Sequence, residues 1–161
     1  MEHSLPPLRA LSLCLFCALL AAPGAVSLAA DKAQAVYVGS EKCKECHDEQ
    51  YESYHKYSRK AHSFQSIKKM QPKLTAEEYQ SCFECHTTGH GKPGGFVSES
   101  QTPELKNAGC ETCHGPGSLH AESQEPKDIK TKLSAQDCLT CHNEERVGSF
   151  KYRPLIYGGG H

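Results

Sequence analysis

The sequence predicts a mainly α-helical protein with much irregular structure and minimal β-strand. Three observations support this fold class: one long segment has the residue spacing of a helix, two segments begin with helix-capping sequences, and glycine and proline are frequent between them. The chain also has no Trp and few large aliphatic residues after its N-terminal segment. Such a chain buries too little apolar surface to offset the entropy lost on folding, so we expect another component in its core.

Residues 1–30 have the pattern of a secretory signal peptide that is cleaved. A short polar segment with a basic residue precedes an apolar stretch over residues 10–22, and small residues near its end provide a cleavage site. A retained membrane anchor is the alternative, but the apolar stretch is short and is interrupted at Pro23-Gly24. We therefore expect a single exported domain over residues 31–161 with no stable membrane insertion. Its expected location is periplasmic, with an extracellular or cell-surface location as the alternative.

The predicted helices are separated by polar connections. Residues 44–70 are expected to be helical with a break near Ser58, and a helical stripe that includes tyrosine and histidine runs from His47 to His62. The other predicted segments are helix starts at residues 75–78 and 134–137, a Gly- and Pro-rich loop at residues 87–103 with a short strand at Phe96-Val97, and a charged, solvent-exposed connector from Glu122 to Lys132.

The cysteines follow one repeated pattern. Eight of the ten lie in four Cys-x-x-Cys-His motifs. The cysteines of the motifs are Cys43, Cys46, Cys82, Cys85, Cys110, Cys113, Cys138 and Cys141. The histidines that complete them are His47, His86, His114 and His142. The other two, Cys14 and Cys17, lie in the apolar N-terminal stretch, are not followed by His, and carry no site.

The spacing within each motif indicates covalently attached haem. Residues at positions i, i+3 and i+4 of a helical turn share one face, so both sulfurs can bond to the porphyrin edge while the imidazole lies under the iron. Zinc ribbons or four disulfides are the alternatives, but neither requires His after the second Cys. The four motifs therefore predict four haem c groups, with iron bound by each motif histidine. The fold class becomes a multihaem cytochrome with a core of stacked haems.

The second axial ligand of each iron decides whether a haem only carries electrons or also binds a substrate. Residues 31–161 contain a single Met, Met70, so Met ligation serves at most one haem. The histidines outside the motifs are His55, His62, His90, His120 and His161. This supply favours bis-histidine haems. His62 projects away from the first motif towards another haem, whereas His90 follows His86 too closely to reach the opposite face of the same haem.

Several short segments around the motifs form a specific combination. They are Gly39-Ser40, Ala61-His62, Thr87-Thr88-Gly89 after the second motif, Gly94-Gly95-Phe96, and the run from Cys110 to Gly117 followed by His120. This combination resembles the tetrahaem cytochrome c-554 family. The resemblance implies a mostly helical periplasmic electron carrier with closely packed haems. With the haems numbered in the order of their motifs along the chain, it further implies that His62 ligates haem 3, His120 ligates haem 1 and His161 ligates haem 4. A member of the family leaves haem 2 without a distal protein ligand.

The expected function is therefore transfer of electrons between a redox protein donor and a redox protein acceptor, rather than enzymatic catalysis. The formal net charge of −1 gives no reason to expect nucleic acid as a partner. Two alternatives stay open. One is a self-assembling subunit of an extracellular haem polymer, and the other is a small-molecule (nitrogen oxide) reductase with an open, five-coordinate haem 2.

Overall fold

The computed structural model describes Met1 and residues 34–146. The chain divides into two units, Met1–Asp31 and Lys32–His161, and every described helix belongs to the second. The expected signal peptide, including Cys14 and Cys17, and the candidate ligand His161 lie outside the described residues. Within residues 34–146, none of the helices has the length and apolar character that crossing a bilayer requires.

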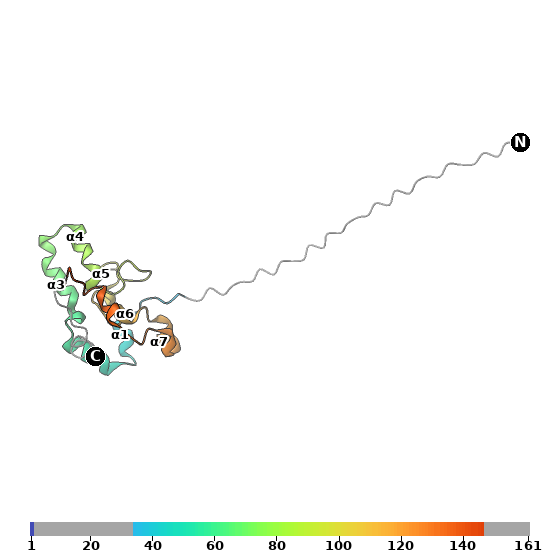
Figure 1. Cartoon of the computed structure of the whole chain (residues 1–161), viewed down its shortest axis with the longest axis horizontal. Helices are drawn as coiled ribbons and strands as arrows, with labels where there is room; N and C mark the ends of the chain where they lie inside the picture. The colour runs from blue at the N-terminus through green and yellow to red at the C-terminus, as the bar shows by residue number, and fades with distance from the viewer. Residues whose placement is uncertain (2–33, 147–161) are drawn as a thin grey trace. The chain divides into compact units, whose positions relative to one another are not determined.

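Short helices joined by irregular segments make up the described part of the chain, which contains no β-strand (Figure 1). The α-helices are α1 (Ser40–Lys44), α2 (Asp48–Tyr57), α3 (Ser63–Met70), α4 (Ala76–Ser81), α5 (Phe83–His86), α6 (Cys110–His114), α7 (Ser118–Ser123) and α8 (Ala135–Leu139). The 3-10 helices are η1 (Arg59–His62), η2 (Gln71–Lys73), η3 (Pro103–Leu105) and η4 (Pro126–Asp128). The mainly α, irregular fold class is thereby confirmed.

The expected strand at Phe96-Val97 is wrong. The Phe96 amide donates to the Thr88 carbonyl at 2.9 Å, but the next amide, of Val97, donates to the Thr102 hydroxyl instead of a backbone carbonyl. A single backbone bond without a continuing ladder does not make a strand. The residue pattern does not show that the Thr102 side chain, and not a second strand, accepts the hydrogen bond of the Val97 amide.

The long helical segment breaks where the sequence predicts. Helix α2 ends at Tyr57, and Ser58 has an extended backbone, with φ −93° and ψ 123°. The Ser58 hydroxyl accepts a hydrogen bond from the Lys60 amide at 3.3 Å, which caps the start of η1. Both predicted capping boxes are also present, at residues 75–78 and 134–137. Local side-chain chemistry therefore sets these helix boundaries.

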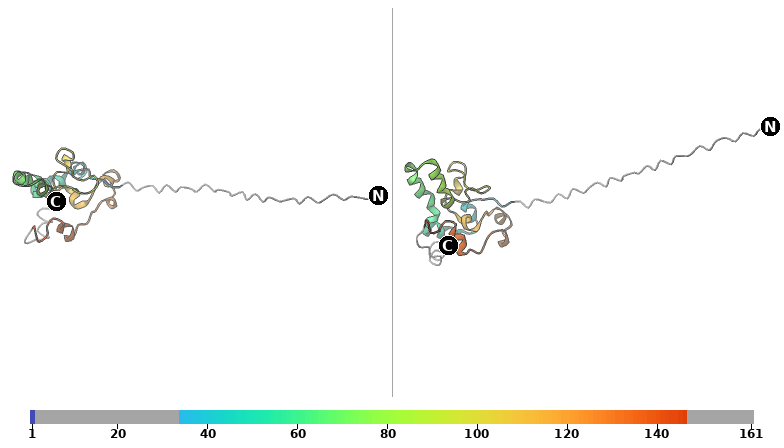
Figure 2. Two further views of the ribbon diagram at one scale, coloured as in Figure 1. Left: turned by 90° about the horizontal axis from the view of Figure 1, so that it is seen from above. Right: turned by 45° about the horizontal axis from the view of Figure 1, so that its top comes forward.

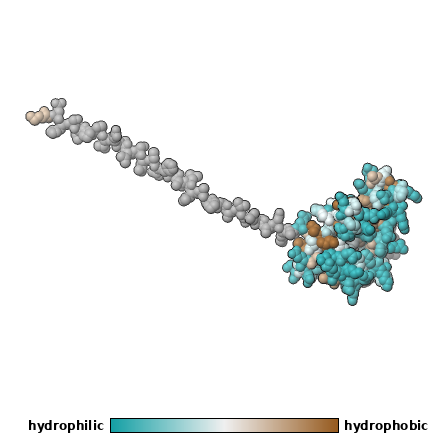
Figure 3. Space-filling model, turned by 180° about the vertical axis from the view of Figure 1, so that it is seen from behind, coloured by the Kyte–Doolittle hydropathy of each residue, from teal (hydrophilic) through white to brown (hydrophobic). Residues whose placement is uncertain are grey.

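The apolar core is small. Its main cluster is Phe64, Ile67, Phe83, Phe96 and Leu105, and the other buried hydrophobic residues among those described are Tyr51, Tyr54, Ala61 and Ala108. Helix α3 contributes two of these side chains and packs against α5, while η2 joins α3 to its neighbour α4 (Figure 1, Figure 2). The face seen in Figure 3 is mostly hydrophilic, with one small hydrophobic patch. So few buried apolar side chains agree with the expectation that the protein chain supplies only part of its own core.

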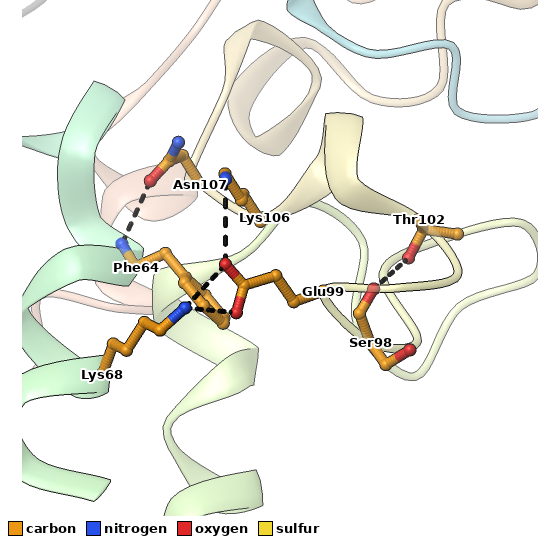
Figure 4. Close-up of polar contacts among 7 residues, drawn as sticks. All are labelled: Phe64, Lys68, Ser98, Glu99, Thr102, Lys106 and Asn107. Carbon is orange, nitrogen blue, oxygen red and sulfur yellow. Dashed lines mark hydrogen bonds and ion pairs between the residues drawn. The ribbon is translucent and has the colours of Figure 1, made fainter.

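Residues 87–103 form a compact loop tied to this core. Their ends are held by the Thr88 amide, which donates to the Leu105 carbonyl at 2.9 Å. Further along the loop, the Glu99 carboxylate accepts from Lys68 of α3 at 2.7 and 2.9 Å and lies 3.9 Å from the Lys106 ammonium (Figure 4). Because these charges are exposed, they orient the loop more than they stabilise it.

Candidate functional site

Each Cys-x-x-Cys-His motif lies on a single helical turn. In the first motif the His47 amide donates to the Cys43 carbonyl at 2.9 Å. The second and fourth motifs repeat this bond, from His86 to Cys82 at 3.1 Å and from His142 to Cys138 at 2.9 Å. Helix α6 is the whole of the third motif. The structure therefore places two thiols and one imidazole on the same face of every motif, as attachment to a porphyrin requires.

The motifs meet each other through their cysteines. The Cys43 and Cys110 thiols share a hydrogen bond, which raises the pKa of Cys43 and lowers the pKa of Cys110. Helix α1 packs against α6 at this point, and the Cys110 amide donates to the Ser40 hydroxyl at 3.1 Å. The first and third motifs are thus side by side, although 62 residues separate His47 from Cys110 in the sequence.

The second and fourth motifs form a similar pair. Burial and the neighbouring Cys85 thiol, which is also a hydrogen-bond partner, raise the pKa of Cys141 to about 12. The thiols of the third and fourth motifs also affect each other: after the larger effect of burial, the Cys138 thiol helps to raise the pKa of Cys113, and the Cys113 thiol helps to raise the pKa of Cys141. These effects pair the first motif with the third, the third with the fourth and the fourth with the second.

Several histidines are oriented by a hydrogen bond between Nδ1 and a backbone carbonyl. The partners are the carbonyls of Ser63 for His86 at 3.0 Å, Lys130 for His114 at 2.7 Å, Glu125 for His120 at 3.0 Å and Phe96 for His90 at 3.0 Å. A carbonyl can only accept, so Nδ1 carries the proton and the lone pair of Nε2 is left for a metal. This is the usual arrangement of a histidine that binds a metal.

One pair of imidazoles has the ring separation that two ligands of one iron would need. The rings of His47 and His120 have centroids 6.2 Å apart and planes inclined by 18°. Metal–imidazole bonds of about 2 Å on opposite sides of one iron would separate the ring centres by roughly 6 Å. The residues present therefore fit an iron held between them.

His62 and His55 are arranged differently. The His62 Nε2 atom lies 2.9 Å from the His55 carbonyl oxygen, and the two rings meet edge to face at 5.9 Å. The His55 ring also stacks on Tyr51 at 4.0 Å. The described contacts of the His62 ring are thus with His55 of α2, so its role as a ligand of haem 3 stays a prediction.

The connector from Glu122 to Lys132 does more than the sequence predicted. Its charged side chains are largely exposed, as expected, but its backbone supplies the carbonyls that orient His114 and His120. The Lys130 side chain also pairs with Asp137 at the start of α8. Sequence patterns carry no signal for such a role, because every residue has a backbone carbonyl.

The Asp137 contacts predict a pH-dependent stability. The hydrogen bond from Lys130, followed by those from the Ser134 amide and hydroxyl, lowers the pKa of Asp137 from 3.8 to about 2. A lowered folded-state pKa adds stability above the unfolded value of 3.8, and this contribution is lost as the pH falls to about 2. We therefore expect Asp137→Asn to lower the melting temperature at neutral pH but not at pH 2.

Thermal unfolding of the haem-loaded protein between about pH 6 and pH 2 measures this difference. Glu144→Gln is the control, because it also removes one exposed negative charge near the fourth motif. A constant difference between Asp137→Asn and the unaltered protein across the whole range would show that the carboxylate charge is not responsible.

The fold and the motifs are similar to those of multihaem c-type cytochromes, a class of electron-transfer proteins with covalently bound haem c. Residues 42–115 match the family model described as cytochrome c554 and c-prime. The chain is thus similar to the cytochrome c-554 family, which confirms the resemblance seen in the sequence. The fourth motif, at Cys138, lies beyond the matched residues.

A curated protein sequence and a solved structure show the same similarity. Cytochrome c-554 of Nitrosomonas europaea (strain ATCC 19718) is 37% identical over 102 residues, which cover 56% of this chain and 42% of that protein. The match thus spans less than half the length of this relative. The solved structure of reduced cytochrome c554 from the same species superposes with a TM-score of 0.56 at 26% identity, over 77% of this chain and 83% of the other.

Proposed function

We propose that this protein is an exported, periplasmic carrier that takes electrons from one redox protein and passes them to another through four closely packed haems. The observation that carries the proposal is the contact between cysteines of different motifs. Cys43 meets Cys110, Cys113 approaches Cys138, and Cys141 meets Cys85. Each motif therefore has a neighbour to which an electron can move.

These contacts support one order of haems. A cysteine of a haem motif bonds to the porphyrin edge, so two cysteines in contact bring two porphyrin edges together. The order would be haem 1, haem 3, haem 4 and haem 2. Haems 1 and 2 are then the ends of the path, where electrons enter and leave.

The proposed ligands follow from the motifs and from the oriented histidines. The haems would be attached to Cys43, Cys46, Cys82, Cys85, Cys110, Cys113, Cys138 and Cys141. The proximal ligands would be His47, His86, His114 and His142. His120 is the proposed second ligand of haem 1, supported by its position opposite His47. His62 and His161 are proposed for haems 3 and 4 on the family resemblance. Bis-histidine ligation gives lower potentials than Met/His ligation, which suits an electron carrier.

Low-temperature electron paramagnetic resonance of the oxidised protein tests this proposal, because it counts low-spin and high-spin ferric haems separately. We expect four haems per chain, and we expect His120→Ala to convert one low-spin haem into a high-spin haem. His55→Ala is the control, since His55 stacks on Tyr51 and is not a proposed ligand. Fewer than four haems per chain, or an unchanged spectrum for His120→Ala, would contradict the proposal.

A further inference from the structure

A buried carboxylate stands inside the third motif. Glu111 lies between Cys110 and Cys113 and is only 2% exposed. Burying an ionised carboxylate is costly unless hydrogen bonds replace the lost water. Here backbone amides do so: Oε1 accepts from Val38 at 3.0 Å and from Gly117 at 2.7 Å, while Oε2 accepts from Gly39 at 2.8 Å and from Val38 at 3.2 Å. Neither the motif nor the proposed electron path explains this arrangement.

The amides come from two separate segments of the chain. Gly39 is the N-cap residue of α1, the helix that leads into the first motif and His47. Gly117 is the N-cap residue of α7, which carries His120. One carboxylate therefore holds the start of both helices, with a different oxygen atom directed to each.

Direct bonds between the two segments are few and lie at the same place. The Val36 amide donates to the Ser118 hydroxyl at 2.9 Å, and the Ser118 amide donates to the Val36 carbonyl at 3.1 Å. Both bonds join exposed or half-buried groups, whereas the bonds of Glu111 to Gly39 and Gly117 are buried. Buried charge-assisted bonds are the stronger and the more costly to break.

We infer that Glu111, although it belongs to the motif of haem 3, is a positioning residue for haem 1, because its carboxylate holds α1 and α7 so that His120 lies opposite His47. The inference rests on the proposed function, in which these histidines are the two axial ligands of one iron. It goes beyond that function by making the coordination of haem 1 depend on a residue that binds no haem. The fixed negative charge beside the first motif also favours the ferric state of haem 1.

The variant Glu111→Gln tests the inference in the haem-loaded protein. The Gln amide cannot accept from all three backbone amides, because its NH2 group is a donor and would face one of them. We expect part of the low-spin ferric signal to become high-spin, and we expect added imidazole to restore the low-spin signal. One haem potential should also shift in the positive direction. Glu122→Gln is the matched control, since it removes an exposed charge from α7 itself.

A second variant perturbs only one side of the carboxylate. A Cβ atom at Gly117 would lie 3.2 Å from the Glu111 Oε1 atom, so Gly117→Ala presses α7 away while it leaves the charge and the bond to Gly39 in place. The backbone of Gly117, with φ −102° and ψ 0°, is accessible to Ala. We expect a smaller high-spin fraction than in Glu111→Gln, and we expect added imidazole to convert it back to low-spin. If Glu111→Gln does not accumulate with its haems, Gly117→Ala decides by the same measurement.

The outcomes separate this inference from the proposed function. If His120→Ala adds a high-spin haem but Glu111→Gln and Gly117→Ala both leave the numbers of low-spin and high-spin haems and the potentials unchanged, the role of Glu111 is wrong and the carrier function stands. If added imidazole does not convert the new high-spin haem back to low-spin, the variant has lost structure generally, which would also overturn the inference. If His120→Ala itself changes nothing, the axial ligation in the proposed function fails.

Discussion

Replacing both Cys110 and Cys113 with serine should slow electron exchange between the first and fourth haems by orders of magnitude. These cysteines are the proposed attachment points of haem 3. The contacts of Cys110 with the first motif and of Cys113 with the fourth make haem 3 the link between them. Rapid one-electron reduction followed by optical detection of electron redistribution measures the effect, after the haem content has been shown to fall from four to three per chain.

The control removes a haem from the end of the path. Replacing Cys43 and Cys46 with serine also lowers the haem content to three, but it leaves the third, fourth and second motifs in contact. We expect exchange among the remaining haems to keep its rate. Equal slowing in both double variants would show that the haems do not follow the order of the motif contacts.

Gly95→Ala is expected to have the largest effect on stability of any single methyl addition to the loop at residues 87–103. A Cβ atom at Gly95 would lie 1.7 Å from the Gly89 carbonyl oxygen and 2.4 Å from its carbon. Both groups are backbone, so the loop must open. Phe96, which follows directly and is 2% exposed, would then leave the core. We expect a loss of more than about 3 kcal/mol in the free energy of unfolding.

The matched control is Gly91→Ala in the same loop. Gly91 has φ +75°, but no atom lies within 4 Å of its added Cβ, so only backbone strain of about 1 kcal/mol is expected. Chemical denaturation of the haem-loaded variants measures both values. Similar losses for the two variants would mean that Gly89 and Gly95 are not in contact in the folded protein.

The helical segments could be predicted because their causes are local. The break at Ser58 depends on a side chain bonding to an amide two residues away, and both capping boxes act across three residues. Gly115 ends α6 with φ +78°, a conformation that glycine adopts without strain. A single sequence displays all of these signals directly.

One prediction was wrong and two roles were missed where a group found a distant or unexpected partner. The strand at Phe96-Val97 was predicted from residue type, yet the Val97 amide donates its hydrogen bond to the Thr102 hydroxyl and not to a neighbouring strand. The connector after Glu122 was judged by its charges, yet its carbonyls orient His114 and His120. Glu111 went unnoticed as a functional residue, because an acidic side chain within a motif normally indicates exposure.

The sequence by itself determined the turns that carry the motifs, because two cysteines and a histidine at i, i+3 and i+4 share a face wherever a helical turn forms. It also predicted the mainly helical fold class and the residues proposed to attach haem. Only the tertiary structure decided which motifs are neighbours and which amides Glu111 holds. Those contacts join groups such as Val38 and Glu111, which are 73 residues apart, and such pairs are set by packing of the whole domain rather than by local spacing.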